Sequence, residues 1–223
     1  FSLSMSLFVS VTLVPVLLLL HATYERNHTF RSMASIWEDA VNKSPGNPRA
    51  HYNLGVAHQS EGRYDDAIKH FYHSLRLDPN CEDSHFNLGV IFYNVGYIDK
   101  AIDHYIYALK LNPDAATHNN LAVCYSAKGL KGPTIEHFRQ AVVLDPSFTE
   151  AQFNLGLACL ENGHADEAKA AFVRAIETDP THKQARYYLD MFSQGGRGLI
   201  GSFNKDFGSA GGRPLIGSMF GTQ

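Results

Sequence analysis

One pattern of about 34 residues is written four times between residues 48 and 182. A leucine and a proline each recur in every copy at a fixed place. The leucines are Leu54, Leu88, Leu121 and Leu155, and the prolines are Pro79, Pro113, Pro146 and Pro180. In both sets the spacing is 34 residues except between the second copy and the third, where it is 33. A period of this size is typical of a solenoid, in which each unit buries its apolar face only against its neighbours.

Each copy has the spacing of two amphipathic helices. In the first copy, apolar residues recur three and four apart, as in Ala67, Phe71 and Leu75. A glycine interrupts every copy at its middle, where a left-handed helix ending costs glycine least. These glycines are Gly62, Gly96, Gly129 and Gly163. The proline ends the second helix, because it disfavours helix at the preceding residue and lacks an N–H. The sequence therefore predicts antiparallel helix pairs.

The copies agree at further positions, counted from Pro48 as position 1. Positions 6 to 8 read Asn-Leu-Gly or Asn-Leu-Ala, position 20 is small, position 24 is aromatic and position 27 is small. This pattern closely resembles the tetratricopeptide repeat (TPR) family over all four copies; Ala122 replaces a glycine and Thr134 an alanine. The resemblance implies an all-α, right-handed superhelix of antiparallel helix pairs. Small residues at positions 8 and 20 let the two helices approach, and the aromatic ring fills the space between them.

A half-repeat precedes the first copy and another follows the last. Trp37 lies 34 residues before Phe71, and Leu189 lies 34 after Leu155, so each flank carries one helix that can cap the stack. We therefore predict four full repeats plus a half-repeat at each end. The expected segments are 1–20 (transmembrane helix or signal peptide), 21–47 (juxtamembrane segment and capping half-repeat), 48–81, 82–114, 115–148 and 149–182 (TPR 1 to 4), 183–193 (C-terminal capping helix) and 194–223 (Gly-rich disordered tail).

Residues 1–20 contain no charged side chain, and about 20 apolar residues suffice to cross a bilayer. We predict an N-terminal transmembrane helix that places the protein at a membrane. The alternative is a secretory signal peptide starting at Met5, although no Lys or Arg precedes the apolar run. The side of the membrane that carries the repeats is open, because the comparison of basic residues needs both flanks. The tail from Gln194 is either a flexible end or a duplicated short peptide that docks on a partner or on the repeats.

The apolar run and the stretch after it carry a second resemblance. Residues 10–80, with Ser35-Ile36-Trp37-Glu38-Asp39-Ala40-Val41-Asn42-Lys43-Ser44-Pro45, are similar to the C-terminal part of polytopic O-mannosyltransferase-like membrane proteins that carry TPRs. In that family the catalytic acidic residues lie in early extracytoplasmic loops. The resemblance therefore implies a catalytic part upstream and gives no residue of this sequence a catalytic role.

No pattern of catalytic or metal-ligating residues stands out. The net charge of −3 and the lack of a basic stripe argue against nucleic acid as a partner. Histidine fills position 4 in His51, His85 and His118, and position 23 in His70, His104 and His137. Members of one column lie about 10 Å apart in stacked pairs, too far to share one zinc ion. Cys81, Cys124 and Cys159 give neither a disulfide framework nor zinc spacing. We expect no enzyme activity in this fragment, no cofactor, no metal and no small-molecule substrate.

Binding of a protein or peptide is the function that the repeats favour. In the TPR fold, first helices line a concave groove, and position 6 is asparagine in every copy. An amide both donates and accepts, so an asparagine ladder can hold an extended peptide; equally, these side chains can cap or bridge neighbouring helices. Aromatic and aliphatic residues at positions 5, 9 and 12 lie beside the ladder. The predicted groove residues are Asn53, Asn87, Asn120, Asn154, Tyr52, Phe86, Phe153, Val90, Tyr93 and Val123.

Two functions follow from this interpretation. The first is a membrane-tethered scaffold that binds a protein or peptide partner in its concave groove. The alternative is the C-terminal partner- or substrate-recruiting region of a polytopic O-mannosyltransferase-like glycosyltransferase. Chaperone-tail binding is not expected, because position 2 offers Arg49, Asp83, Ala116 and Glu150 instead of a basic carboxylate clamp.

Overall fold

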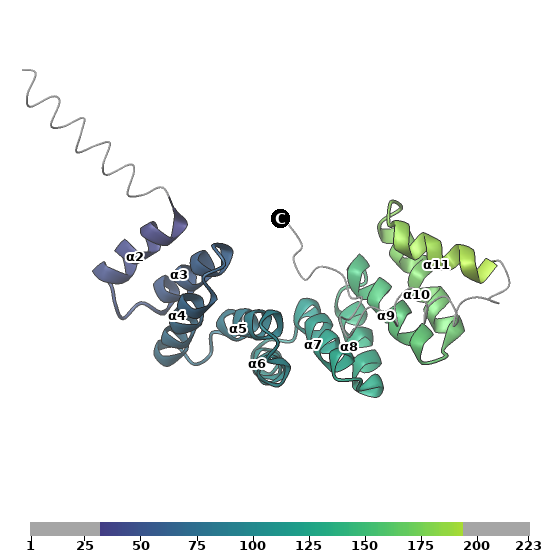
Figure 1. Ribbon diagram of the computed structural model, residues 1–223, viewed down its shortest axis with the longest axis horizontal. Helices are drawn as coiled ribbons and strands as arrows, with labels where there is room; N and C mark the ends of the chain where they lie inside the picture. Colours follow the sequence, from purple (N-terminus) through teal and green to yellow (C-terminus); the bar gives the residue numbers. More distant parts are fainter. Residues whose placement is uncertain (1–31, 194–223) are drawn as a thin grey trace, which may run out of the picture. The chain divides into compact units, whose positions relative to one another are not determined.

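The computed structural model describes residues 32–193, which form ten α-helices and no strand. The helices are α2 (Met33–Lys43), α3 (Pro48–Ser60), α4 (Tyr64–Leu77), α5 (Glu82–Asn94), α6 (Ile98–Leu111), α7 (Ala115–Ala127), α8 (Lys131–Leu144), α9 (Thr149–Glu161), α10 (Ala165–Thr178) and α11 (Lys183–Ser193). Within each predicted copy two helices pack as a pair: α3 with α4, α5 with α6, α7 with α8, and α9 with α10 (Figure 1). The prediction of an all-α fold built from helix pairs is confirmed.

The chain divides into two compact units, and the division in the sequence lies between Pro79 and Asn80. The described part of the first unit contains α2, α3 and α4, and that of the second contains α5 to α11. In the second unit, successive pairs pack through α6 with α7, α8 with α9 and α10 with α11. The right-handed superhelix across the whole chain stays a prediction.

The predicted membrane segment at residues 1–20 and the predicted tail at 194–223 lie outside the described residues. Between residues 32 and 193, every helix is too short or too polar to cross a bilayer.

The turn inside each pair depends on the predicted glycine. After α3, Gly62 has φ of +74°, and the N–H of Arg63 donates to the carbonyl of His58 over 2.9 Å. The three equivalent glycines have φ of +87°, +70° and +77°. A side chain is strained at such angles, which is why glycine occurs here in every copy. The second helices end as expected too: Asp78, Asn112, Asp145 and Asp179 are their extended C-caps, each directly before a proline.

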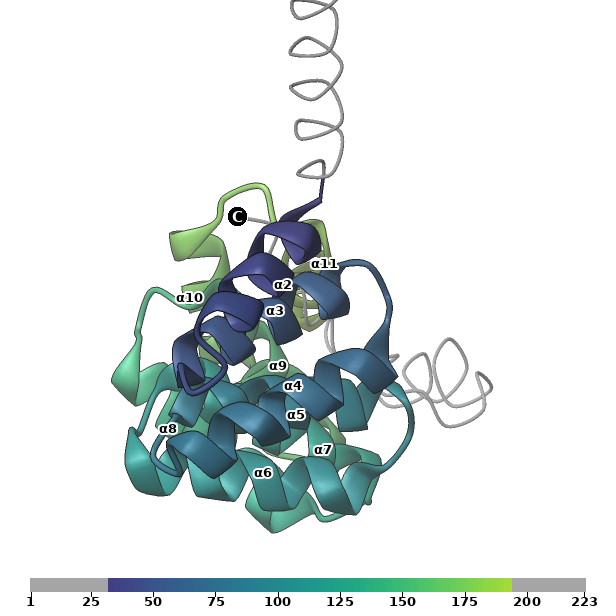
Figure 2. The same cartoon turned by 90° about the vertical axis from the view of Figure 1, so that its left-hand side faces the viewer.

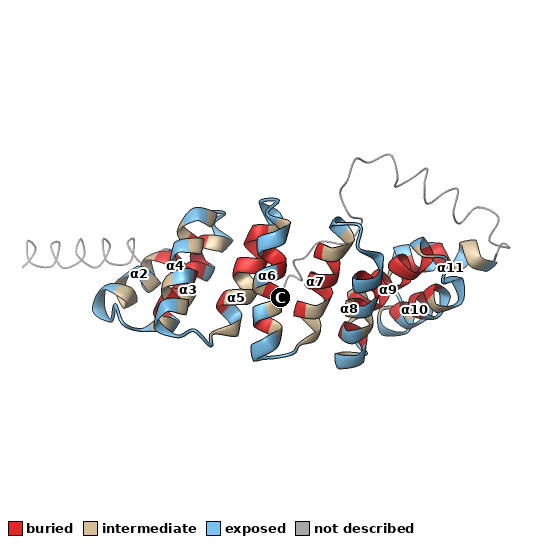
Figure 3. Ribbon diagram, turned by 90° about the horizontal axis from the view of Figure 1, so that it is seen from below, coloured by how far each residue is buried: buried red, intermediate tan, exposed pale blue. Residues whose placement is uncertain are grey.

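The core of each pair is an aromatic ring pressed against a small residue of the partner helix. The rings at position 24 (Phe71, Tyr105, Phe138 and Phe172) have no exposed surface. A Cβ atom added at Gly55 would stand 2.8 Å from the Phe71 ring, and one at Gly156 would stand 2.5 Å from Phe172. Figure 3 shows the buried residues gathered on the facing sides of the helices. The sequence predicted this close approach from the small residues at position 8.

A single helix covers each end of the described repeats. In the first unit, α2 packs against α3 (Figure 2), where Trp37 and Val41 contact the buried side chains of Ala34 and Leu54. In the second unit, α11 brings Tyr188 onto Phe172, with ring centroids 5.0 Å apart and the rings nearly parallel. Trp37 is thus a packing residue, as predicted.

Substitution of Gly156 by Ala tests the close approach. Phe172 is fully buried and stacked on Tyr188, so its ring has little room to move away from a new methyl group. We expect Gly156→Ala to lower the free energy of unfolding by about 1–2 kcal/mol, as overpacking does, although alanine favours helix. Urea unfolding followed by circular dichroism measures the change.

The matched control is Gly132→Ala in α8, where a new Cβ would meet nothing within 4 Å. It makes the same chemical change in open space and should raise stability by about 0.5–1 kcal/mol through helix propensity. Equal effects of the two substitutions would contradict the packing account.

Candidate functional site

The four predicted ladder asparagines lie in different surroundings. Asn53 is half-buried in the first unit, and the other three lie in the second. Asn87 is half-buried and donates from Nδ2 to the carbonyl of Asp83 in its own helix over 2.9 Å. Asn120 and Asn154 are 6% and 1% exposed. The exposed surface of the predicted ladder therefore lies mainly at Asn53 and Asn87.

A fifth asparagine links the two buried members. Asn119 donates from Nδ2 to Oδ1 of Asn120 over 3.2 Å, and its Oδ1 accepts from Nδ2 of Asn154 over 3.1 Å. This buried chain of amides joins α7 to α9. These hydrogen bonds are of the kind expected when asparagines bridge neighbouring helices. Binding of a peptide by the asparagine ladder stays a prediction. The sequence pattern missed Asn119, because position 5 is asparagine in the third copy alone.

The aromatic and aliphatic groove residues also divide by exposure. Tyr52, Phe86 and Tyr93 are half-buried and present part of their rings to solvent. Val90, Val123 and Phe153 are 4%, 1% and 3% exposed, so they belong to the core. Phe153 packs against both Phe172 and Tyr188, with ring centroids at 5.7 and 6.1 Å. The capping helix α11 thus covers the side chain that the sequence placed at the last repeat of the groove.

A cavity of about 230 Å³ opens beside Phe86, lined by α5, α6, α7 and the connection before α7. Three carboxylates line it: Glu82, Asp83 and Asp114. Asp114 also caps α7, because its Oδ1 accepts from the N–H of Thr117 over 2.9 Å. Burial raises the pKa of Asp83, and the neighbouring charges of Glu82 and Asp114 raise it further. The cavity thus combines an aromatic wall with a concentration of negative charge.

The histidine columns form pairs across the two helices of each repeat. His51 and His70 place their Nδ1 atoms 3.2 Å apart, His85 and His104 3.0 Å apart, and His118 and His137 2.9 Å apart. Comparison of the same position in successive repeats does not reveal that the histidine at position 4 contacts the histidine at position 23 of its own repeat. The signal was present as a constant separation of 19 residues in three copies.

Burial keeps His70 and His104 neutral near pH 7. Burial is the largest cause and, together with the charge of neighbouring histidines, it lowers the pKa of His70 and of His104 to about 4. Burial also lowers the pKa of His118 and of His137. A neutral pair forms one hydrogen bond, in which one ring donates from Nδ1 and the other accepts.

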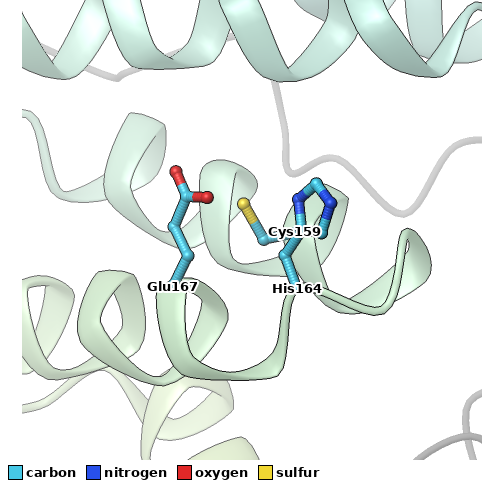
Figure 4. A group of neighbouring side chains, drawn as sticks. All are labelled: Cys159, His164 and Glu167. Atoms are coloured by element: carbon cyan, nitrogen blue, oxygen red, sulfur yellow. The ribbon is translucent and has the colours of Figure 1, made fainter.

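Cys159, His164 and Glu167 form a cluster near the start of α10, with possible ligand atoms all within 4.8 Å of one another (Figure 4). Arg139 of α8 donates to both carboxylate oxygens of Glu167, each over 2.8 Å, and this lowers the pKa of Glu167. Burial raises the pKa of the Cys159 thiol to about 12. The carboxylate is already paired with a fixed positive charge, which disfavours a cation here. The ion pair between Arg139 and Glu167 therefore links α8 to α10.

Comparison with known proteins identifies three of the four copies. A family model described as tetratricopeptide repeat matches residues 48–81, and a second with the same description matches residues 82–115 and 149–182. These segments are tetratricopeptide repeats. The boundaries agree with the predicted copies to within one residue.

Two curated proteins resemble parts of the chain. The protein O-mannosyl-transferase F38B6.6 of Caenorhabditis elegans is 34% identical over 73 residues, which make up 33% of this chain and 10% of that protein. The Photosystem I assembly protein Ycf3 of Cyanophora paradoxa is 37% identical over 142 residues, 60% of this chain and 65% of that protein. The chain thus spans less than two thirds of either relative.

Solved structures share the fold. The crystal structure of MamA matches with a TM-score of 0.60 and 26% identity over 68% of this chain and 88% of that chain. YrrB, whose structure is described as a TPR protein with an unusual peptide-binding site, matches with a TM-score of 0.65 and 18% identity over 79% and 95%. These likenesses confirm the helical TPR architecture of the described residues.

The His85–His104 pair predicts loss of stability in acid. The unfolded chain binds a proton near pH 6.5, whereas burial, His85 and Lys100 hold the pKa of His104 at about 4 against the opposing charge of Asp103. Between these values the unfolded state binds more protons, so the free energy of unfolding falls as pH falls. We expect a loss of about 1–2 kcal/mol from this pair between pH 7 and pH 5.

Urea unfolding across that pH range measures the loss. The comparison variant is His85→Gln/His104→Ala, which introduces the residues that the fourth repeat has at these positions, Gln152 and Ala171. Its stability should fall less steeply with acid. An identical pH dependence in both proteins would show that the pair does not titrate as described.

Proposed function

We propose that the chain is a non-catalytic TPR scaffold that binds a protein or peptide partner, and that the partner contacts the cavity beside Phe86. The observation that carries this proposal is the combination of a partly exposed ring with three carboxylates around one cavity of about 230 Å³. An aromatic wall in a pocket is the usual anchor of an interface, and the carboxylates favour a positively charged group. The preferred partner is therefore an extended or helical peptide with a Lys or Arg side chain.

The rest of the surface around the cavity supports this assignment. Asn87 follows Phe86 in α5, and Tyr93 is a second half-exposed ring on the same helix. Asp83 lies nearly one turn before Phe86, so the two share a side of α5, and burial together with the charges of Glu82 and Asp114 raises its pKa. A basic side chain placed here would neutralise this charge, which a neutral peptide could not do.

Selection from a random peptide library, followed by fluorescence anisotropy on the selected sequences, tests the proposal. We expect enrichment of Lys or Arg, and Phe86→Ala should weaken binding by about 10- to 30-fold, as loss of a buried anchor does. The control for loss of an exposed ring is Tyr187→Ala in α11, 48% exposed and outside the cavity. Its affinity should match the unsubstituted chain.

The charge requirement is tested with Glu82→Gln/Asp83→Asn/Asp114→Asn. Asparagine also caps helices, so the change at Asp114 preserves the start of α7. This variant should lose affinity for basic peptides and most of the salt dependence of binding. Asp103→Asn/Asp166→Asn removes exposed acids outside the cavity and should change neither. Equal affinity of all these variants would refute the site.

A second candidate function follows from the O-mannosyl-transferase relative, because the likeness covers 73 residues of this chain at 34% identity. In this alternative the repeats recruit a partner or substrate for a larger membrane glycosyltransferase, and residues 1–20 belong to its membrane part. Mass spectrometry of the endogenous protein distinguishes the two. Peptides of a polytopic segment joined to this sequence would favour the enzyme, and a short chain starting at Met5 would favour the one-span or secreted scaffold.

A further inference from the structure

The three acids around the cavity beside Phe86 occur together in the second copy alone. Positions 1 and 2 of the four copies read Pro48-Arg49, Glu82-Asp83, Ala115-Ala116 and Thr149-Glu150. The residues that follow the four copies directly are Cys81, Asp114, Phe148 and His182, so Asp114 is the one acid among them. The cavity therefore differs from the same place in the other copies by its negative charge, and a ligand that depends on this charge has one site to bind.

The sequence contains a basic peptide of the kind that this cavity favours. The tail, residues 194–223, lies outside the described residues and holds two arginines and one lysine against one aspartate. Each arginine begins one copy of the duplicated peptide, followed two residues later by Leu-Ile-Gly-Ser. The two peptides are Arg197-Gly198-Leu199-Ile200-Gly201-Ser202 and Arg213-Pro214-Leu215-Ile216-Gly217-Ser218. A cation followed by apolar residues complements carboxylates beside an aromatic ring.

We propose that the second peptide, residues 213–218, binds the cavity beside Phe86 in its own molecule, with Arg213 among the three carboxylates. This inference rests on the proposed function, because it names a basic peptide for the same site. The guanidinium donates to the carboxylates and packs on the half-exposed ring of Phe86. Glu82 and Asp114 already act on Asp83 with like charge, and a bound cation offsets this repulsion.

The length of chain after α11 selects the second peptide over the first. Helices of the second unit pack in succession from α5 to α11, and neighbouring axes lie about 8–10 Å apart, so α5 is at most about 60 Å from α11. The 20 residues from Ser193 to Arg213 extend to about 66–72 Å at most. The four residues from Ser193 to Arg197 extend to about 14 Å, and three helices separate α11 from α7 in this succession.

Proline also favours the second peptide. The residue before a proline is restricted to extended backbone, so Arg213 loses fewer conformations on binding than Arg197, which precedes a glycine. Bound in its own molecule, the peptide competes with any partner for the cavity. A tethered ligand of this kind acts at an effective concentration of about 1 mM. The tail thus sets the affinity that a partner needs in order to bind.

Fluorescence anisotropy with a labelled peptide of residues 211–221, added to the full chain, tests the proposal. We expect Arg213→Ala in the full chain to bind this peptide about 10-fold more tightly than the unsubstituted chain, because a competitor at about 1 mM weakens a site with a Kd of about 100 µM by that factor. The matched control is Arg197→Ala, which removes the same charge from the peptide that is too near α11 to reach the cavity. Its affinity should equal that of the unsubstituted chain.

Two results would overturn the inference. Equal affinity of all three chains for the labelled peptide would show that Arg213 does not compete for the cavity. A mass that rises with concentration in sedimentation of the unsubstituted chain, and not of Arg213→Ala, would show that the peptide binds a second copy instead. The gain in affinity should also disappear when Arg213→Ala is combined with Glu82→Gln/Asp83→Asn/Asp114→Asn, since that chain lacks the charges of the cavity.

Peptides selected from the random library keep this inference separate from the proposed function. If they bind the Arg213→Ala chain and lose affinity when Phe86→Ala is added, the cavity binds basic peptides whatever the tail does. The proposed function then stands even where equal affinity for the labelled peptide defeats the inference. If neither the selected peptides nor the labelled peptide bind the Arg213→Ala chain, both proposals fail.

Discussion

The contact between a small residue on a first helix and an aromatic ring on the second fixes the separation of the helices in each pair. At Gly55, Gly89 and Gly156 the ring lies where a Cβ atom would otherwise stand, between 2.5 and 2.8 Å at the nearest atom. Each ring is fully buried, so the two helices cannot shift apart without opening the core. The third repeat accommodates Ala122 at the same place, with Phe138 still fully buried. The histidine pairs join the same two helices, so their nitrogen–nitrogen distances depend on this separation too.

The sequence predicted the features that repeat and missed those that occur once. Glycine turns, proline ends and buried rings recur in every copy, because every helix pair needs them; each is therefore visible as a column. Asn119 bridges Asn120 and Asn154 but occupies its position in one copy only. Coverage of Phe153 by α11 was missed for a related reason, since a position assigned to the groove in a middle repeat becomes core beside a cap. The histidine pairs repeat, yet they join two columns, and comparison along single columns cannot reveal them.

Side chains differ between the repeats at positions that the packing of the helix pair does not constrain. Positions 8 and 24 are constrained by packing, whereas the places beside the histidine pair hold His58 in the first repeat, Phe92 in the second and Tyr125 in the third. Each of these rings packs against the histidine at position 23, so all three fill the same space in their repeats. In the same way, the acids around the Phe86 cavity lie at helix starts and in a connection, where a charge costs little. The scaffold therefore accommodates an acidic cavity beside Phe86 without a change in the packing of the helix pairs.

We propose that a basic peptide binds where α5, α6 and α7 meet. Hydrogen–deuterium exchange of the full chain, with and without a selected Lys- or Arg-containing peptide at saturating concentration, locates the surface that the peptide covers. We expect slower exchange at the start of α5 (Glu82–Asn94) and at the start of α7 (Ala115–Ala127), with little change in α9 and α10. Protection confined to other helices while the peptide is bound would show that the peptide binds elsewhere.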